Sequence, residues 1–276
     1  MQKWKGYKAA IEENFMIVDK DKMKVPFKLN PPQVDFIKKS TDRNVILKAR
    51  KMGFSSLLLA IACLKFLHGK NERCVSMSFD VNASTKQLER AKQFIDSYMQ
   101  INRLDYKFKY NTKTEMVFQN IDENGEKYTN TLRIGTAQTA GFGRGDDISF
   151  LHLTEVSLAD NLEELLAGVG EAVINDAMIT LETTANGYNP FKTFWDEASS
   201  GARGYSAFFY EPKWEYSEEF LARKRKELGR LYDQEYPESP EIAFIASGLH
   251  FFDTEAMRWY LDNHKQPIKD PYVSKI

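Results

Sequence analysis

The sequence has 276 residues, 42% hydrophobic and 28% charged, which is long and apolar enough to fold around a large core and excludes a disordered chain. No segment reaches the roughly 18 consecutive apolar residues of a membrane span, and the charged N-terminus lacks a signal-peptide core, so we expect a cytoplasmic protein without membrane partners. The net charge of −1 conceals a basic segment: residues 1–52 contain 13 Lys and Arg against 6 Asp and Glu, a composition that suits either a polyanion partner or an ordinary solvated surface.

Strand-like and helix-like segments alternate in the first part of the chain. The apolar run 44–49 predicts a buried strand, and residues 57–67 after a glycine-containing loop predict a buried helix. A second strand is expected over 73–79, followed by a helix over 82–99 whose apolar residues recur on one face. The two cysteines belong to these apolar segments and form no CxxC or Cys/His cluster, so they are expected to be reduced core thiols rather than disulfide or zinc ligands.

The middle of the chain predicts a hairpin and two further core strands. Segments 115–119 and 128–135 flank an Asn-Gly pair, which supplies the positive φ angles of a tight turn, and we expect an edge hairpin. Residues 148–153 and 177–181 predict core strands on either side of an acidic helix over 158–168. Strands that alternate with helices predict an α/β fold with a mostly parallel sheet flanked by helices.

The C-terminal part of the chain changes character. An amphipathic helix is expected over 217–231, followed by a segment in which two prolines interrupt the helical pattern. We expect one domain over 1–248, with its basic segment at 1–43, and a linker-like tail over 249–276 that contains a helix at 254–263.

The loop after the first strand contains most parts of a phosphate-binding loop. Ligands bind outside the carboxyl ends of the strands in open α/β sheets, so this loop is the first place to look. Residues 48–56 (KARKMGFSS) match the pattern G-x-x-x-x-G-K-[ST] only at Gly53 and Ser55, and Phe54 stands in the place of the lysine. The glycine still permits tight curvature, and the start of the next helix would direct N–H groups at a phosphate.

The missing lysine has three possible substitutes in the same loop. Lys48, Arg50 and Lys51 could each bring positive charge to the phosphates, while Ser55 and Ser56 provide hydroxyls where magnesium is coordinated. A basic turn without any special purpose is the alternative interpretation.

Two residues with candidate functional side chains directly follow the strand over 148–153. Glu155 at the strand tip is the candidate general base that polarises a water molecule. Thr154 stands where an Asp would normally help to hold magnesium, and its neutral hydroxyl could contribute only through a bound water. The alternative is that Glu155 is a surface glutamate that caps the following helix.

Four segments stand in the order of four motifs of one family. They are a glutamine motif, a phosphate loop, a second nucleotide motif and a coupling motif, at residues 27–33 (FKLNPPQ), 44–56 (NVILKARKMGFSS), 151–155 (LHLTE) and 181–187 (LETTANG). With these motifs, the chain resembles the ATPase domain of the large terminase subunit, the DNA-packaging motor of tailed bacteriophages, from about residue 28 to 252. The resemblance implies a P-loop NTPase core of the ASCE type, with a small C-terminal helical or linker segment.

The resemblance also implies roles for individual residues. Gln33 would read the adenine edge, unless it is an ordinary amide on a helix surface. Thr183, Thr184 and Asn186 would sense the γ-phosphate and couple hydrolysis to movement, with a simple Asn-Gly turn as the alternative.

A glycine-rich loop over 141–146 contains Arg144, which resembles an arginine finger that one subunit contributes to the site of its neighbour. Arg suits this role because its forked donors match a γ-phosphate whose charge is spread over several oxygens. The alternative is a local ion pair with Asp146 or Asp147.

By this resemblance the chain is a magnesium-dependent ATPase that drives double-stranded DNA into a procapsid in the host cytoplasm. ATP and Mg²⁺ are the expected cofactors, and the expected partners are the portal protein, the small terminase subunit and further copies of the chain in a ring. DNA contacts are expected to be to phosphates and independent of sequence. In isolation the chain could be a monomer.

The sequence also fits two other functions, and it predicts that the chain does not cleave DNA. A helicase-like remodelling ATPase shares the nucleotide chemistry, and a nucleotide-binding module of little activity would fit Phe54 and Thr154. Family members typically continue into a nuclease domain whose clustered carboxylates bind metal. No such cluster follows residue 252 in this sequence, so we expect no DNA cleavage by this chain.

Overall fold

The computed structural model describes residues 6–19, 21–79, 81–137 and 147–247, together with Trp259 and Asn263. Its central element is an eight-stranded sheet of order β10-β3-β9-β8-β4-β7-β6-β5. All neighbours from β10 to β7 pair in parallel, whereas β6 and β5 add to the sheet antiparallel. The predicted mostly parallel sheet is therefore confirmed.

The strands of this sheet range in length from 4 residues in β5 to 11 residues in β9. In sheet order they are β10 (Ser206–Tyr210), β3 (Arg43–Lys48), β9 (Val173–Thr183), β8 (Ile148–Thr154), β4 (Arg73–Ser78), β7 (Lys127–Thr136), β6 (Glu115–Ile121) and β5 (Phe108–Asn111). A separate two-stranded sheet consists of β1 (Met16–Val18) and β2 (Lys24–Pro26).

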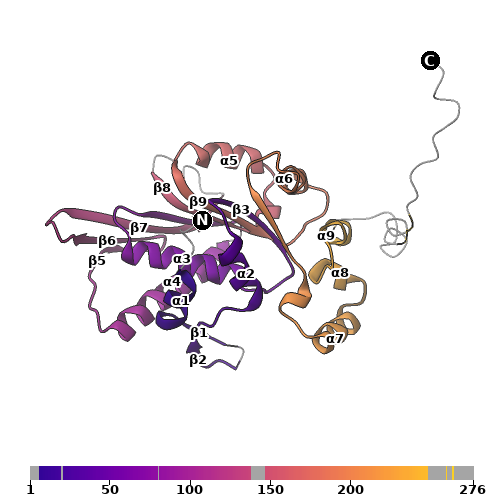
Figure 1. Ribbon diagram of the computed structural model, residues 1–276, viewed down its shortest axis with the longest axis horizontal. Helices are drawn as coiled ribbons and strands as arrows, with labels where there is room; N and C mark the ends of the chain where they lie inside the picture. The colour runs from indigo at the N-terminus through magenta and orange to yellow at the C-terminus, as the bar shows by residue number, and fades with distance from the viewer. Residues whose placement is uncertain are drawn as a thin grey trace, which may run out of the picture.

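Helices cover both faces of the sheet (Figure 1). On one face lie α1 (Tyr7–Asn14), α2 (Pro31–Lys39), α3 (Phe54–His68) and α4 (Val81–Asn102). On the other face lie α5 (Leu162–Gly170) and α6 (Pro190–Ser199), and beside the sheet lie α7 (Glu218–Leu228), α8 (Tyr232–Glu235) and α9 (Pro240–Ser247). Single 3₁₀ turns are η1 (Val156–Leu158), η2 (Pro212–Trp214) and η3 (Gly229–Leu231). Within the described residues, no helix combines the length and hydropathy needed to cross a bilayer.

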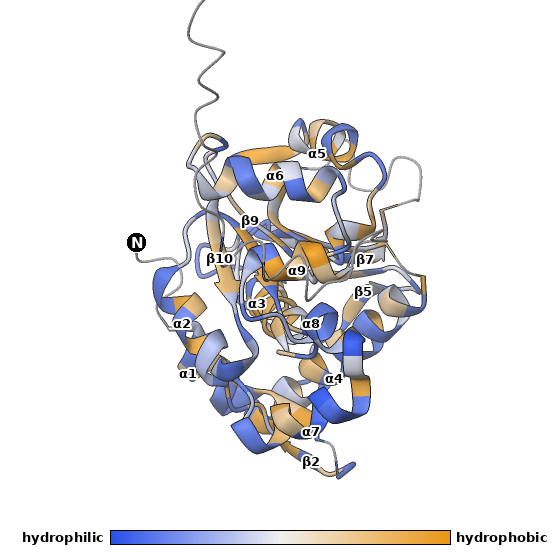
Figure 2. Ribbon diagram, turned by 90° about the vertical axis from the view of Figure 1, so that its right-hand side faces the viewer, coloured by the Kyte–Doolittle hydropathy of each residue, from blue (hydrophilic) through white to orange (hydrophobic). Residues whose placement is uncertain are grey.

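Alternation along the strands divides the core in two. Successive side chains of a strand point to opposite faces, so Ile46 packs with α3 and α4, while Val45 and Leu47 pack with α5 and α6. Helix α3 is buried on nearly all sides because it lies between the sheet and other helices, and Figure 2 shows its hydrophobic colouring in the interior. A parallel sheet covered on both faces explains the almost continuously apolar strands.

Several boundaries differ from the sequence-based expectations for local reasons. The helix expected over 217–231 ends at Leu228, because Gly229 has a φ of 52°, and the chain continues as η3 and α8. The hairpin forms around Gly125, but β5 pairs with the outer side of β6, so β5 and not the hairpin is the edge of the sheet. The expected helix at 254–263 lies outside the described residues except at its positions 259 and 263, which are helical.

Candidate nucleotide-binding site

The loop between β3 and α3 turns sharply at the carboxyl end of the sheet. Lys51 and Gly53 both have left-handed backbones, with φ angles of 60° and 76°. A Cβ atom at Gly53 would lie 2.8 Å from the side-chain nitrogen of Gln33, so this position needs glycine both for its φ angle and for space. The loop then leads directly into Phe54, the first residue of α3.

Gln33 of α2 and Asn30, the N-cap residue of this helix, bind the backbone of the loop. Nε2 of Gln33 donates to the Gly53 carbonyl at 2.8 Å, and Nδ2 of Asn30 donates to the Met52 carbonyl at 3.1 Å. The same two residues form the capping box of α2, in which the Gln33 carbonyl accepts from the Asn30 N–H. Both ends of the Gln33 amide, which the resemblance assigns to adenine, are thus engaged by the chain's own backbone in this structure.

The three cations of the loop point in different directions. Lys48 is buried, and its Nζ lies 3.1 Å from Oε2 of Glu182. The guanidinium of Arg50 turns outward and binds both carboxylate oxygens of Glu235 at 2.8 Å. Lys51 has an exposed side chain, and its carbonyl accepts from the Tyr216 hydroxyl. Of these three candidates for the missing lysine, Lys48 is the one held beneath the loop.

A cluster of oxygen atoms surrounds the carboxylate of Glu182. Its Oε1 accepts from the hydroxyls of Ser55 and Thr154, the latter at 2.5 Å, and these two hydroxyl oxygens lie 3.5 Å apart. The residues meet because β9 lies between β3 and β8 and pairs in parallel with both, which places Glu182 between Lys48 and Thr154. Glu182 belongs to the segment that resembles the coupling motif, but sequence reasoning gave it no role.

Polar contacts continue from Glu182 into the core. Nε2 of His152 lies 3.5 Å from Oε1 of Glu182, and its Nδ1 lies 2.9 Å from the hydroxyl of Ser76. Ser76 in turn donates to the side-chain carbonyl of Gln87 on α4 at 3.0 Å. All four side chains are buried. The signal in the sequence that could have revealed them is their polarity within otherwise apolar strands.

Burial and charge act together on the pKa values of this cluster. Burial alone would raise the pKa of Glu182, but the Lys48 ammonium, the neighbouring His152 imidazole and the hydrogen bond from Ser55 outweigh it and hold this pKa well below its ordinary range. Burial would lower the pKa of Lys48, but the carboxylates of Glu182 and Glu155 raise it. Both shifts favour the charged forms of this pair.

Glu155 follows β8 with an unusual backbone. Its φ of 57° and ψ of 40° lie in the left-handed region, which costs a residue with a side chain roughly 1–2 kcal/mol. Its N–H donates to the carbonyl of Glu182 at 2.8 Å, and its side chain is partly exposed. Burial raises the pKa of Glu155, against the opposing charge of Lys48, and the Glu182 carboxylate adds to the rise. Local strain at this position is consistent with a functional residue.

The expected coupling residues contact the turn that follows Glu155. Oγ1 of Thr183 lies 2.8 Å from the hydroxyl of Ser157, and Nδ2 of Asn186 donates to the Ser157 carbonyl at 3.2 Å. Thr184 directly follows and is partly buried, and its carbonyl lies 2.8 Å from Oγ1 of Thr183. The end of β9 and the turn after β8 are thus joined by side-chain hydrogen bonds.

The remaining predicted residues lie at the margins of this site. The hydroxyl of Ser56 accepts from the guanidinium of Arg90 on α4 at 2.6 Å. Phe54, in the lysine position, is fully buried against Phe36 and Tyr210 and does not obstruct the loop. Arg144 lies outside the described residues.

The oxygen atoms at the carboxyl ends of these strands suit the coordination of a magnesium ion. Mg²⁺ prefers oxygen ligands, and Ser55, Thr154 and Glu182 bring two hydroxyls and one carboxylate to a single point. Among the described residues there is no group of three or more His, Cys, Asp or Glu side chains that could hold a metal ion. A metal here would therefore depend on hydroxyls, few carboxylates and the substrate's phosphates.

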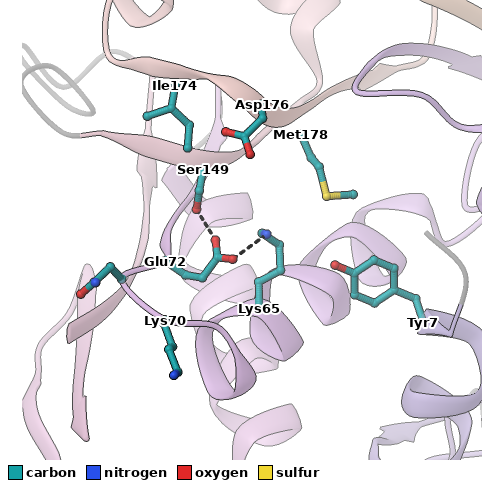
Figure 3. A pocket seen from close by; sticks show the side chains of 9 residues that line it. Tyr7, Lys65, Lys70, Glu72, Ser149, Ile174, Asp176 and Met178 are labelled. Carbon is teal, nitrogen blue, oxygen red and sulfur yellow. Dashed lines mark hydrogen bonds and ion pairs between the residues drawn. The ribbon is translucent and has the colours of Figure 1, made fainter. Parts of the chain in front are cut away.

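A pocket of about 360 Å³ lies at the amino ends of the strands, opposite to this site, and is separate from it. Figure 3 shows Glu72 between Lys65 and Ser149, and its carboxylate accepts from both. These groups satisfy each other at the amino ends of β4 and β8, so the pocket adds nothing to the chemistry at the carboxyl edge.

Comparison with known proteins supports the fold through structure rather than sequence. No protein-family model matches the chain, and a search of curated proteins found no significant match. Among solved structures, the chain is similar to the large terminase ATPase domain of Thermus phage P74-26, with a TM-score of 0.58 and 14% identity over 74% of this chain and 91% of that one. It is also similar to the large terminase of bacteriophage HK97, with a TM-score of 0.60 and 18% identity over 85% of this chain and 53% of that one.

A third similar structure contains a nucleotide. The large terminase of a thermophilic bacteriophage, in complex with ADP, matches with a TM-score of 0.52 and 12% identity over 74% of this chain and 52% of that one. At sequence identities this low, the structural similarity shows the fold alone, and the roles of individual residues depend on the geometry of the site. The chain therefore has the fold of the ATPase domains of phage large terminases, as the resemblance of its motifs predicts.

Proposed function

We propose that this chain, over residues 1–248, is the magnesium-dependent ATPase motor domain of a viral large terminase. The observation that carries the proposal is the meeting, at one edge of the sheet, of the Gly53 loop, the buried ammonium of Lys48 and the carboxylate of Glu155. All three stand where a parallel sheet of this kind binds its ligand. The similarity in fold to terminase ATPase domains, including one in complex with ADP, supports the same conclusion.

The chain's own residues divide the work of phosphoryl transfer between them. The N–H groups of the loop and of the first turn of α3 would bind phosphate oxygens, and Lys48 would leave Glu182 to pair with them. Glu155 would orient a water molecule and accept its proton. Ser55, and Thr154 through a bound water, would hold Mg²⁺, which neutralises charge on the phosphates when it is bound.

The wider assembly belongs to the same proposal. Double-stranded DNA would be held through its phosphates without regard to sequence, within a homo-oligomeric ring that engages the portal protein and the small terminase subunit in the host cytoplasm. Arg144 would complete the site of a neighbouring subunit. These partners are supported by the resemblance of the motifs and by the terminase fold.

ATP turnover in the parent chain and in Glu155→Gln tests the activity. The variant keeps the size of the side chain and removes the base, so we expect turnover to fall by about 100-fold or more while nucleotide binding persists. Glu115→Gln, at a partly exposed ion pair with Arg133 in the hairpin, is a matched control that should retain full activity. Equal background rates in the parent and in Glu155→Gln would favour an inactive nucleotide-binding module. Strand separation on a forked duplex without any capsid would favour a helicase-like ATPase.

A further inference from the structure

The proposed magnesium site lacks a carboxylate at the position where nucleotide sites of this kind normally have one. Mg²⁺ bound with substrate phosphates is usually held by a loop hydroxyl and by one or two carboxylates. The strand β8 offers only the neutral hydroxyl of Thr154 at this point. Another residue must supply the negative charge if the site binds the ion well.

The carboxylates of Glu182 and Glu155 differ in what surrounds them. Glu182 is completely buried, and its Oε1 accepts from both Ser55 and Thr154, which are the two hydroxyls expected to face the metal. Glu155 is partly exposed, and within the described part of the chain its carboxylate has no hydrogen-bond partner. Glu155 thus remains available to a water molecule, whereas Glu182 is fixed among the metal's other donors.

The second oxygen of Glu182 is also unusual. Within the described part of the chain, Oε2 is buried and accepts no hydrogen bond of good geometry. The ammonium of Lys48 lies 3.1 Å from it. A buried carboxylate is costly unless a cation compensates it. The Glu182 carboxylate therefore requires a positive charge beside it, and Lys48 provides that charge in this structure.

From these contacts we infer that Glu182, on β9, supplies the carboxylate of the magnesium site in place of the acidic residue that Thr154 does not provide. This inference rests on the proposed function. The order of strands makes the replacement possible, because Glu182 and Thr154 are paired residues of neighbouring parallel strands. A carboxylate at this position of the neighbouring strand thereby reaches the point where the side chain of an acidic residue at position 154 would lie. Lys48 would be released toward the phosphates as the metal takes its place beside Glu182.

Metal-dependent nucleotide binding tests this assignment without relying on turnover. The affinity of a fluorescent ADP analogue would be measured with Mg²⁺ and with EDTA, and Mn²⁺ binding in the presence of ADP would be followed by EPR. For Glu182→Gln we expect the gain in affinity from Mg²⁺, and the affinity for Mn²⁺, to fall by about 10–100-fold. The affinity of Glu182→Gln for the ADP analogue in the presence of EDTA should be equal to or higher than that of the parent, because a negative charge beside the phosphates has been removed.

A second variant restores the carboxylate from the neighbouring strand. Thr154→Asp combined with Glu182→Gln returns one negative charge to the same cluster, and we expect it to recover most of the Mg²⁺ dependence. Glu72→Gln is the matched control, because Glu72 also pairs with a lysine and a serine hydroxyl but at the opposite edge of the sheet. This control should leave the Mg²⁺ dependence unchanged, whatever its effect on stability.

The possible outcomes separate the two proposals. If the parent binds nucleotide with Mg²⁺ dependence and Glu182→Gln keeps that dependence, the assignment of Glu182 is wrong and the motor proposal stands. If Glu182→Gln loses turnover alone, Glu182 has a different role from the one assigned. A parent that binds no nucleotide under either condition overturns the proposed function itself.

A crystal structure of the parent with Mg²⁺ and a non-hydrolysable ATP analogue decides the question if Glu182→Gln does not fold. The assignment holds if a Glu182 oxygen lies about 2.1 Å from the ion or is joined to it through one of its waters. An ion held without Glu182, with the pair to Lys48 still in place, overturns it.

Discussion

The residue in the lysine position of the phosphate loop has become part of the core. The ring of Phe54 contacts Phe36 edge-on, and its centroid lies 4.9 Å from that of the Tyr210 ring, which is ordinary aromatic contact. In the proposed site, the charge that a lysine would bring comes instead from Lys48, the last residue of β3. The departure from the usual pattern thus exchanges a flexible cation for a fixed aromatic contact.

Phe54→Ala should destabilise the fold without removing the nucleotide site. Truncation of a fully buried phenylalanine costs about 3–5 kcal/mol, and chemical unfolding measures this as a lower free energy of unfolding. Ile101→Ala, at a half-exposed position near the end of α4, is the control and should change stability by less than about 0.5 kcal/mol. Loss of nucleotide affinity in a well-folded Phe54→Ala would contradict the structural role of this ring.

Lys48→Met should remove nucleotide binding and also weaken the fold. The change leaves the Glu182 carboxylate buried without its cation, which costs about 3–5 kcal/mol. Lys48→Met combined with Glu182→Gln removes both charges and should recover much of the stability while ATP turnover stays at background. Thermal unfolding and turnover measured on the same preparations check both parts. Full turnover in Lys48→Met would show that Arg50 or Lys51 provides the phosphate contact.

At the scale of elements, the loop is held from two sides. Helix α2 and its cap bind the carbonyls of Met52 and Gly53, and the C-terminal helices bind the other end of the loop, where Glu235 accepts from the N–H and the guanidinium of Arg50. The Tyr216 hydroxyl adds a hydrogen bond to the Arg50 carbonyl at 3.0 Å. The loop owes its shape to these neighbours as much as to its own sequence.

Gln33→Ala distinguishes two roles for the glutamine motif. If Gln33 acts by holding the loop, its loss leaves the Gly53 carbonyl without this donor, costs about 1–3 kcal/mol, and weakens ATP and GTP binding by the same factor. If Gln33 reads adenine, ATP binding should weaken while GTP binding does not. Competition between the two nucleotides, measured for the parent and for Gln33→Ala, gives the answer. The contacts in the structure lead us to expect the equal loss.

On the scale of the whole molecule, the active edge is assembled from distant parts of the chain. The strands β3, β9 and β8 bring together the loop, Glu182 and Glu155. Helix α9 also belongs to the domain, because its Phe244 packs with Phe191 of α6 in the core of the second face. Helix α9 is therefore part of the domain, and Glu235 of α8 contacts the loop through Arg50, so the proposed motor would have a direct connection between its loop and its C-terminal helices.

Mixed assemblies test whether the site is completed by a second copy. Arg144→Ala and Glu155→Gln should each reduce turnover to background, because one removes the finger and the other the base. Mixing the two variants should restore part of the turnover, since an intact Arg144 from one subunit can then reach an intact Glu155 in another. Unchanged turnover in Arg144→Ala would remove the finger from the mechanism.

Local patterns were sufficient to predict much of this protein. The apolar runs predict β3, β4, β8 and β9 and the buried helix α3, because burial on both faces of a parallel sheet demands such runs. The glycine of the loop and the acidic strand end at Glu155 are also local signals. Short elements such as α1, β1 and β10 were not predicted, because so few residues show neither a helical period nor a strand alternation clearly enough to indicate a face.

The sequence by itself therefore determined the sheet class, and it predicted the loop at Gly53 and the candidate base Glu155, because these follow from periodicity and from residue types within a short window. Only the tertiary structure decided that Glu182 stands between Lys48 and Thr154, and that Arg50 and the amide of Gln33 are used to hold the loop. The order of strands across a sheet depends on contacts between segments more than 100 residues apart, such as that of Ser55 with Glu182, and no local pattern records that order.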